Sequence, residues 1–353
     1  MNTSPHSSQE SLSFSPWSRP FDPGSILLIR FHALGDVAVT LPSSKGLRDR
    51  YPGARIDFLT LPSAAGFLRS LALFDHVFEF PLRKNRAASF AAALRWGLHF
   101  RRQNYDVILD LQRNRLTRVI RRMASPEAWS EFDRFSPRSA SDRVNGSFER
   151  GGLDRIVPSC EVSTNEREQE EALHLLHQEG YQGGKKLVVL NPAGLWETRN
   201  WPLENYVSLA EWWLNREPVQ FVIMGTERVL AAASFIRSRL GVSLIDLVGK
   251  TRLETAFSIL QHASAVITED SGLMHMAWCA GVPVVALFGS SNHIWSSPPG
   301  PLTRVLHSGD LPCGACMDPH CAYGDVHCLT RYTPEQVGRM AIELTALVGD
   351  PHP

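Results

Sequence analysis

The segment ILLIRFHALGDVAVTLP (residues 26–42) consists of a short apolar run, a turn that contains a glycine and an aspartate, and the start of a helical pattern. A short run rich in Ile and Leu favours a buried strand, which we expect at 26–30. The residues that follow predict a helix over about 37–51. Gly35 and Asp36 would then lie beyond the strand end, where Asp36 either caps the helix or takes part in chemistry.

The same alternation of strand and helix runs through most of the chain. Short apolar runs separated by ~10 to 15 residues of helical pattern are typical of βαβ units on a parallel sheet, so we predict an α/β fold. Expected strands lie at 26–30, 55–60, 76–80, 106–111, 186–190, 219–225, 243–249, 265–268 and 282–289. Expected helices lie at 37–51, 63–72, 86–102, 166–180, 203–216, 227–239, 252–263, 272–280 and 334–347. Residues 124–165 show no clear period, and we expect them to be irregular.

A chain of 353 residues is long enough for two domains of ordinary size. The segment GGKK after the helix at 166–180 separates two series of strands and helices. We therefore expect a disordered tail over 1–24, an N-terminal domain over 25–180, a C-terminal domain over 181–333 and a final helix and tail over 334–353. Two parallel α/β domains imply a cleft, with ligands beyond the carboxyl ends of the strands.

Charge is balanced over the whole chain, with 36 Lys and Arg against 36 Asp and Glu, which argues against a general nucleic-acid binder. Between residues 83 and 122, however, there are eleven basic residues and only two acidic ones. This basic stretch is either a solvated helix face or the docking surface for an anionic partner, such as a phosphorylated acceptor or a membrane.

No apolar run approaches the ~20 residues that span a bilayer, and residues 1–24 lack the apolar core of a signal peptide. We expect a cytoplasmic protein, and peripheral association with the cytoplasmic face of the inner membrane stays open.

Four of the six cysteines cluster near the C-terminus. Their pattern, C-x2-C-x4-C-x6-C, is formed by Cys313, Cys316, Cys321 and Cys328. It allows either a structural zinc or iron site or a set of reduced thiols.

The segment AVITEDSGLMHMAWCAG (265–281) places polar residues directly after an expected strand. Asp270, Ser271 and Gly272 begin a helix there, and the free N–H groups of a helix N-terminus can bind a diphosphate. Asp270 or Ser271 can equally be a simple N-cap. His275 follows Ser271 by one helical turn and is expected on the same side.

The segment LNPAGLWETRNWPLENY (190–206) also follows a strand. Asn191 and Gly194 lie in a turn that permits close backbone approach, and Arg199 suits a diphosphate leaving group unless it is a plain surface arginine. Glu227, after the strand at 219–225, either contacts a ribose or caps its helix. TRLE at 251–254 predicts a capping box. The chain has no G-x-G-x-x-G and no P-loop motif, which argues against dinucleotide oxidoreductases and P-loop enzymes.

Together these segments resemble family 9 of the glycosyltransferases, the heptosyltransferase family. The resemblance covers about residues 25–347 and rests on ILLIRFHALGDVAVTLP, YDVILDLQ, NPAGLWETRNWP, LVGKTRLETAFSILQHASAVITEDSGLMHMA and GVPVVALFG. It implies the GT-B fold, in which two Rossmann-like domains with parallel sheets face a central cleft. The N-terminal domain would bind the acceptor and the C-terminal domain the nucleotide sugar.

The resemblance further implies transfer with inversion from a nucleotide sugar, usually ADP-heptose, to a lipopolysaccharide core acceptor, with no cofactor required. In that family the aspartate of the Gly-Asp pair is the proposed base, which corresponds to Asp36. The donor-binding residues expected here are Asn191, Gly194, Arg199, Glu227, Asp270, Ser271, Gly272 and His275. The acceptor-binding residues expected are His32, Gly35, Gln112 and Arg115.

Other functions stay open on the sequence alone. One is a transferase that uses another nucleotide sugar or a protein acceptor. Another is a catalytically silent GT-B-like module that binds an anionic glycolipid or a nucleotide. Nucleic-acid binding through the basic stretch is the most distant of these, because base-stacking aromatic residues are sparse there.

Overall fold

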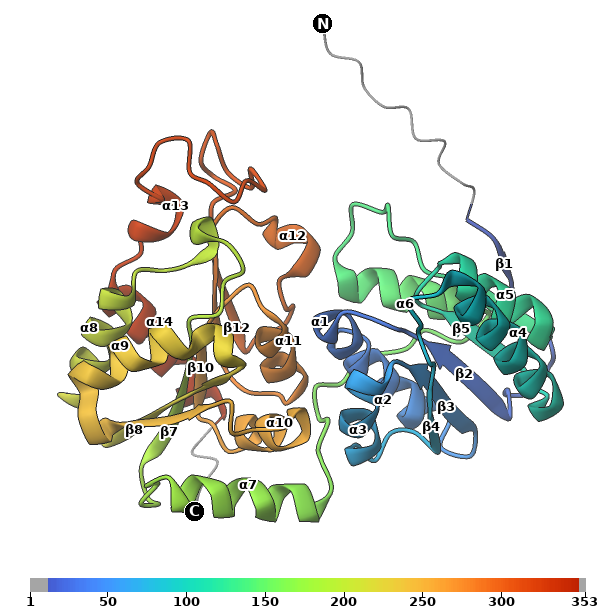
Figure 1. Ribbon diagram of the computed structural model, residues 1–353, viewed down its shortest axis with the longest axis horizontal. Coiled ribbons are helices and arrows are strands. Elements are labelled where there is room, and N and C mark those ends of the chain that lie inside the picture. The colour runs from blue at the N-terminus through green and yellow to red at the C-terminus, as the bar shows by residue number, and fades with distance from the viewer. Residues whose placement is uncertain (1–11, 349–353) are drawn as a thin grey trace, which may run out of the picture.

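The computed structural model describes residues 12–348 of the chain. Its N-terminal domain contains a six-stranded sheet in the order β1-β6-β5-β2-β3-β4 (Figure 1). β1 is antiparallel to β6, and the other neighbours are parallel. The strands are β1 (Phe14–Ser15), β2 (Ser25–Ile29), β3 (Arg55–Thr60), β4 (His76–Glu79), β5 (Val107–Asp110) and β6 (Ala128–Glu131). The helices are α1 (Leu34–Ala38), α2 (Leu41–Arg50), α3 (Pro62–Ser70), α4 (Arg86–Gln103), α5 (Arg115–Ala124) and α6 (Ala140–Arg150). β2 is buried along its whole length, as expected for a central parallel strand.

The C-terminal domain contains a parallel six-stranded sheet in the order β12-β11-β10-β7-β8-β9. Its strands are β7 (Lys186–Asn191), β8 (Val219–Gly225), β9 (Leu244–Val248), β10 (Ala265–Glu269), β11 (Val284–Phe288) and β12 (Thr303–His307). The helices after α6 are α7 (Glu166–Gln178), α8 (Leu203–Leu214), α9 (Leu230–Leu240), α10 (Leu253–Gln261), α11 (Gly272–Cys279), α12 (His293–Ser296), α13 (His327–Thr330) and α14 (Pro334–Val348). Short 3-10 turns are η1 (Glu197–Arg199), η2 (Glu227–Val229) and η3 (Gly241–Ser243). Within the described part of the chain, no helix is both long and apolar enough to cross a membrane.

The direction of strand addition reverses once in each sheet, between β2 and β5 and between β7 and β10. At such a switch point the connections leave in opposite directions and open a crevice beyond the strand ends. The turn that carries Asp36 follows β2, and the turn that carries Asp270 follows β10. Both segments singled out in the sequence therefore lie at switch points.

The two domains meet where α1 packs against α11 and α3 packs against α10 (Figure 1). The rings of Phe67 and Phe257 lie 5.1 Å apart across this boundary. One hydrophobic cluster contains buried residues of both sheets. α7, expected to belong to the N-terminal domain, packs against α10 of the C-terminal sheet.

The helix expected over 37–51 is two helices, α1 and α2, because Pro42 has no N–H to continue the ladder. The carbonyl of Ala38, which would have accepted that N–H, instead accepts the thiol of Cys279 on α11 at 3.0 Å. The break in the helix thus provides a contact between the domains.

Two further expectations about the N-terminal half are wrong. Residues 12–24 are not a disordered tail, because β1 pairs with β6 and Trp17 packs in the core and donates its N–H to Gly151. The expectation that residues 124–165 are irregular is wrong for the parts that form β6 and α6. The rest of the expected tails, 1–11 and 349–353, lies outside the described residues.

Candidate active site

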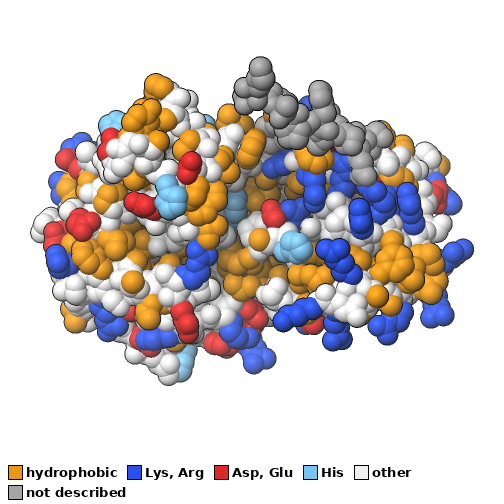
Figure 2. All heavy atoms as spheres, turned by 45° about the horizontal axis from the view of Figure 1, so that its top comes forward, with side chains coloured by type: hydrophobic (Ala, Val, Ile, Leu, Met, Phe, Trp, Pro, Cys, Tyr) orange, Lys and Arg blue, Asp and Glu red, His pale blue; other side chains and the backbone are white. Residues whose placement is uncertain are grey.

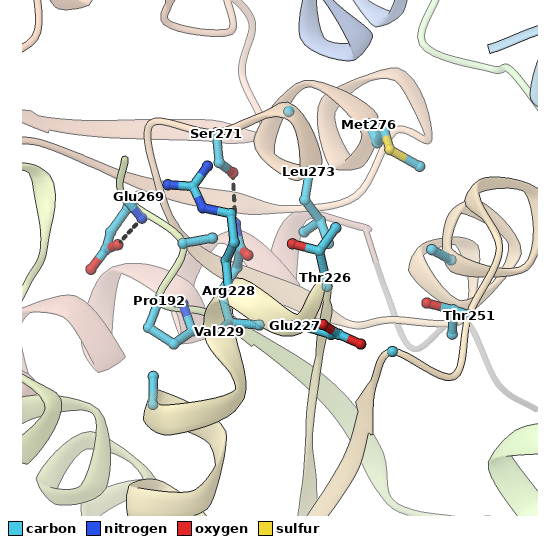
Figure 3. A pocket seen from close by; sticks show the side chains of 18 of the residues that line it. Pro192, Thr226, Glu227, Arg228, Val229, Thr251, Glu269, Ser271, Leu273 and Met276 are labelled. Carbon is cyan, nitrogen blue, oxygen red and sulfur yellow. Dashed lines mark hydrogen bonds between the residues drawn. The ribbon is translucent and has the colours of Figure 1, made fainter. Parts of the chain in front are cut away.

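A cavity of about 680 Å³ opens at the carboxyl ends of the parallel strands of the C-terminal domain (Figure 3). Leu34 of α1 forms part of its wall, so the N-terminal domain contributes to it. Five of the expected donor-binding residues line this strand-end cavity, namely Asn191, Gly194, Glu227, Ser271 and Gly272.

The side chain of Asn191 bridges the switch point between β7 and β10. Its Nδ2 donates to Thr268 Oγ1 and to Ser271 Oγ, both at 2.7 Å. Ser271 is the N-cap of α11, and its Oγ accepts the Met274 N–H, which confirms the capping interpretation for Ser271. Gly272 in the first turn lines the cavity, so the N-terminus of α11, which favours anions, borders it.

Glu269 is a buried carboxylate that ties the loop at 192–201 to the end of β10. Its Oε1 accepts the Trp201 N–H at 2.7 Å, and its Oε2 accepts the Gly194 N–H at 2.5 Å. The Tyr206 hydroxyl donates to Oε1 at 3.3 Å. Burial raises the pKa of Glu269 to about 8, although the three donors oppose this shift. Sequence reasoning missed Glu269, although an acidic residue directly after the buried run AVIT was a visible signal.

Arg199 forms an ion pair with Asp270 at the edge of the strand-end cavity. Its Nη1 lies 3.1 Å from Asp270 Oδ2, and both side chains are largely buried. The guanidinium also lies 4.0 Å from the centroid of the Trp196 ring. The pair adjoins the cavity through its neighbours in sequence, Asn200 and Ser271, which line it.

The turns after β8 and β9 supply residues that sequence reasoning missed or misread. Arg228 follows Glu227 and lines the cavity, and Figure 3 shows its side chain extended into the cavity. The signal in the sequence that could have identified Arg228 was its position directly after Glu227, an acidic residue that follows a strand end. The capping box expected at 251–254 is wrong, because α10 has Arg252 as its N-cap without a side-chain cap bond. Thr251 lines the cavity instead.

Asp36 lies in the first turn of α1, which begins at Leu34, so it is not the N-cap of a helix that starts at residue 37. Its Oδ1 lies 2.9 Å from Arg30 Nη2, and its Oδ2 accepts the Ala33 N–H at 2.8 Å. The side chain is half exposed. These contacts fix the carboxylate and leave acceptor capacity on both oxygens.

α1 and α11 approach closely because each carries a glycine at the contact. A Cβ on Gly35 would lie 3.1 Å from His275 Cδ2 and 3.5 Å from Gly272 Cα. His275 is buried, which lowers its pKa, while the charges of Asp270 and Asp36 raise it. The structure therefore brings together Gly35 and Asp36 of one domain with Asp270, Gly272 and His275 of the other.

The remaining residues expected to bind the acceptor have other surroundings. His32 is exposed, and Arg115 is exposed at the start of α5. Gln112 is buried, and its Oε1 accepts the Phe31 N–H at 2.9 Å.

Three residues of the basic stretch turn inward instead of forming a surface. Arg113, Arg118 and Arg121 surround the buried carboxylate of Glu131, with Arg121 Nη2 at 2.5 Å. The other eight are exposed. Figure 2 shows Lys and Arg side chains gathered over the N-terminal domain, so the expected positive surface exists without these three.

A second cavity, of about 170 Å³, borders Asp36 within the N-terminal domain. We call it the Asp36 cavity. Its lining includes Arg30, Asp36, Phe132, Arg134 and Arg143. Arg134 and Arg143 were not selected from the sequence, because they belong to the segment that was expected to be irregular.

The four clustered cysteines line one cavity of about 360 Å³, and all of them are free. Over residues 12–348, however, no group of three or more His, Cys, Asp or Glu side chains is placed to hold a metal ion. The residues present therefore do not fit the zinc or iron site that the spacing allowed.

Comparisons with known proteins agree with this architecture. The family model for glycosyltransferase family 9 (heptosyltransferase) matches residues 152–327. Lipooligosaccharide heptosyltransferase 2 of Haemophilus influenzae is 23% identical over 299 residues, which cover 78% of this chain and 86% of that protein.

Two solved structures share the fold over almost the whole chain. A family 9 glycosyl transferase of Veillonella parvula has a TM-score of 0.76 at 20% identity, with 92% of this chain and 98% of that chain covered. The ADP-heptose lps heptosyltransferase II of Escherichia coli has a TM-score of 0.72 at 19% identity, with 92% and 99% covered. These likenesses confirm the expected GT-B fold, and the matched segment includes the strand ends that form the strand-end cavity. The chain thus belongs to glycosyltransferase family 9 and is a glycosyltransferase.

Proposed function

We propose that the protein transfers a heptose from ADP-heptose to a lipopolysaccharide core acceptor, with inversion at the anomeric carbon. The observation that carries the proposal is the contact between α1 and α11. This contact brings Gly35, the neighbour of Asp36 in the sequence, against Gly272 in the first turn of α11, and Gly272 borders the strand-end cavity. Relatives named as heptosyltransferases support the choice of sugar and acceptor.

In this proposal the strand-end cavity holds the nucleoside diphosphate. Its volume lies within the ~300 to 1,000 Å³ usual for ligand sites. The N-terminus of α11, together with Arg199 and Arg228, would stabilise the charge that develops on the leaving diphosphate. Glu227, which lines the cavity, would accept a hydrogen bond from a ribose hydroxyl. Because these groups supply the positive charge, the proposed mechanism needs no cofactor.

Asp36 acts as the general base in this proposal. One of its oxygens accepts the proton of the acceptor hydroxyl while that hydroxyl oxygen attacks the anomeric carbon and the diphosphate leaves from the opposite face. Arg30 and the Ala33 N–H keep the carboxylate oriented during the step. A single base contributes about 10² to 10⁴-fold, so orientation by the two closed domains supplies much of the remaining acceleration.

We further propose peripheral association with the cytoplasmic face of the inner membrane. The exposed part of the basic stretch lies beside the exposed apolar side chains of Leu82, Phe90 and Leu98. Anionic lipids attract such cations, and apolar side chains can insert at the interface. Cosedimentation with phosphatidylglycerol vesicles, but not with phosphatidylcholine vesicles, is the expected result.

Asp36→Asn tests the assignment of the base, with Asp49→Asn as the matched control. Asp49 is a helical aspartate of equal exposure, 51%, that also pairs with a cation. We expect Asp36→Asn to lose at least about 10²-fold in turnover with ADP-heptose and a lipid A acceptor carrying 3-deoxy-ulosonic acid, while ADP binds as before. Transfer by Asp36→Asn at the rate of Asp49→Asn would refute the role of Asp36.

A panel of nucleotide sugars distinguishes the remaining alternatives. If the protein releases nucleotide from a different nucleotide sugar and not from ADP-heptose, that sugar is the donor and not heptose. Binding of ADP-heptose without any release, in the presence of either glycolipid or protein acceptors, would identify a silent binding module.

A further inference from the structure

A buried side chain fastens the turn after β2 to the end of β5. Backbone pairing between these two strands ends with Ile29 and Asp110. Just beyond this point Oε1 of Gln112, a buried residue, accepts the Phe31 N–H at 2.9 Å. A buried backbone N–H without an acceptor is costly, so this bond fixes the path of the chain as it leaves β2. The structure thus gives Gln112 a part in holding the turn that carries the proposed base.

Arg30 is a buried cation that connects the same two strand ends with Asp36. It is only 8% exposed, and its Nη2 lies 2.9 Å from Asp36 Oδ1. Its Nη1 donates to the Leu111 carbonyl, which lies between Asp110 and Gln112 in the chain. Burial lowers the pKa of Arg30, whereas the charges of Asp36 and Asp110 raise it. A second carboxylate, that of Asp110, therefore stabilises the buried cation that orients Asp36.

Asp110 has more hydrogen-bonding capacity than the local backbone uses. It is fully buried, and its Oδ1 accepts the N–H groups of Gln112 at 3.2 Å and Arg113 at 2.8 Å. Its Oδ2 has no hydrogen-bond partner among the described residues. The single carbonyl oxygen of an asparagine could accept the same two N–H groups, so the turn after β5 does not require a charge. The charge of Asp110 is left to act on the cation of Arg30.

We propose that Asp110 and Gln112 are positioning residues for the base Asp36. Asp110 keeps the cation of Arg30 in place, and Gln112 keeps the backbone of the turn in place. The inference rests on the proposed function, because it names the groups that orient the carboxylate assigned there. A displacement of about 1 Å at a reacting group can cost ~10²-fold in rate, so the loss of this support is large enough to measure.

The contribution of Asp110 depends on pH. The charged groups that face it are Arg30 from the segment after β2, Arg121 from α5 and Glu131 from β6. Burial raises the pKa of Asp110 to about 6, and the charge of Glu131 adds to this, while hydrogen bonds and the charge of Arg121 oppose it. Above this pH the carboxylate supports the cation of Arg30. As the pH falls through about 6, Asp110 gains a proton and this support is lost.

Asp110→Asn removes the charge and keeps an acceptor for the turn. With ADP-heptose and the glycolipid acceptor at pH 8, we expect kcat to fall at least about tenfold, while the acceptor KM and the affinity for ADP stay unchanged. The difference from the wild type should shrink as the pH is lowered to 5. Because Asp110 acts through Asp36, the double variant Asp36→Asn/Asp110→Asn should be no slower than Asp36→Asn alone.

Two substitutions of Gln112 test the hydrogen bond to the turn. Gln112→Leu removes the acceptor of the Phe31 N–H, whereas Gln112→Glu keeps an acceptor oxygen there. We expect kcat to fall at least about tenfold in Gln112→Leu and by less in Gln112→Glu. Amide hydrogen exchange over residues 30–36, followed by mass spectrometry, should become faster in Gln112→Leu and in Asp110→Asn. This second measurement needs no sugar transfer.

Asp57→Asn is the matched control. Asp57 is also a buried carboxylate of the N-terminal sheet, but it lies on β3 and pairs with Arg55 and His76. We expect this variant to lose stability while kcat, measured where the protein is folded, and the exchange of residues 30–36 stay as in the wild type. A role of Asp110 in stability alone would give Asp110→Asn the same behaviour.

The outcomes separate this proposal from the proposed function. Wild-type kcat in Asp110→Asn or in Gln112→Leu would overturn the role of that residue, and a further loss in the double variant would overturn the action of Asp110 through Asp36. Both results leave the function intact. If the wild type transfers no heptose, the function is refuted and hydrogen exchange decides. Faster exchange over residues 30–36 in both variants would then support the positioning role, and unchanged exchange would overturn it.

Discussion

Replacing Glu269 by Gln tests whether one buried carboxylate holds the wall of the strand-end cavity. Its two oxygens accept the N–H groups of Trp201 and Gly194. A carboxyl group keeps two oxygens that can accept these hydrogen bonds, even when it is protonated. The amide of Gln has only one such oxygen, so its NH₂ group faces one of the two backbone N–H groups. One buried N–H then lacks an acceptor, which at pH 5, where the folded protein holds Glu269 protonated, lowers the free energy of unfolding by about 1 to 3 kcal/mol. Because Gln fills the same volume, no packing defect adds to this loss.

The raised pKa of Glu269 gives a second expectation, which depends on pH. The pKa rises from an ordinary value of 4.5 to about 8 on folding, so between these values the folded protein holds a proton that the unfolded chain has released. This contribution to stability is complete below the lower pKa and is lost as the pH rises through the upper one. The slope is about −1.4 kcal/mol per pH unit. Gln does not titrate, so Glu269→Gln should remove this slope.

Urea unfolding at pH 5, 6, 7 and 8, followed by tryptophan fluorescence, measures both effects. Glu335→Gln is the control, because its exposed pair with Arg339 on α14 contributes only ~0.5 kcal/mol. ADP affinity, measured by calorimetry, should fall in Glu269→Gln because the loop at 192–201 loses its tie. If wild type and Glu269→Gln show parallel stability against pH, Glu269 is ionised in the folded protein and the reasoning from burial is wrong. Equal free energies of unfolding for the wild type and Glu269→Gln at every pH would also show that Glu269 does not hold the loop at 192–201.

Three further variants follow from specific contacts. Arg199→Ala should raise the Kd for ADP about tenfold, and an unchanged Kd by calorimetry would exclude Arg199 from the donor site. Gly46→Ala should lower the free energy of unfolding by about 1 to 3 kcal/mol, because the new Cβ would lie 2.1 Å from the Val157 carbonyl oxygen. This clash outweighs the better helix propensity of Ala. A higher urea midpoint for the variant would contradict the expectation. Trp17→Ala should lose about 3 kcal/mol, and an unaltered melting temperature would show that residues 12–24 do not stabilise the core.

The α/β architecture was predictable because its central strands are buried on both faces. ILLI in β2 and VVALF in β11 are continuous apolar runs, which are typical of parallel strands covered on both faces. β6 was not predicted because it is only four residues long and contains a charged residue, Glu131. The burial of this carboxylate is compensated by three arginines in and just before α5, namely Arg113, Arg118 and Arg121. The break between α1 and α2 had a signal in Pro42, which the helical pattern around it obscured.

The candidate site divides in the same way. Residues directly after strands, such as Asn191 and Ser271, could be selected from the sequence because parallel sheets place them at one edge. Arg134 and Arg143 could not, since their position beside Asp36 depends on the path of the chain from β6 to α6. Periodicity carries no information about that path.

The meeting of Gly35 with Gly272 has a consequence for the order of events in a catalytic cycle. The two glycines let the backbones of α1 and α11 approach closely, with the side chains of Leu34 and His275 packed beside them and the thiol of Cys279 donating weakly to the Ala38 carbonyl. Leu34 on the same helix is a wall of the strand-end cavity, and that wall leaves with α1. A nucleotide in the cavity therefore favours the closed pair of domains, and closure carries Asp36 into place. Donor binding would then precede productive acceptor binding, and the spent nucleotide would leave only after the glycines part.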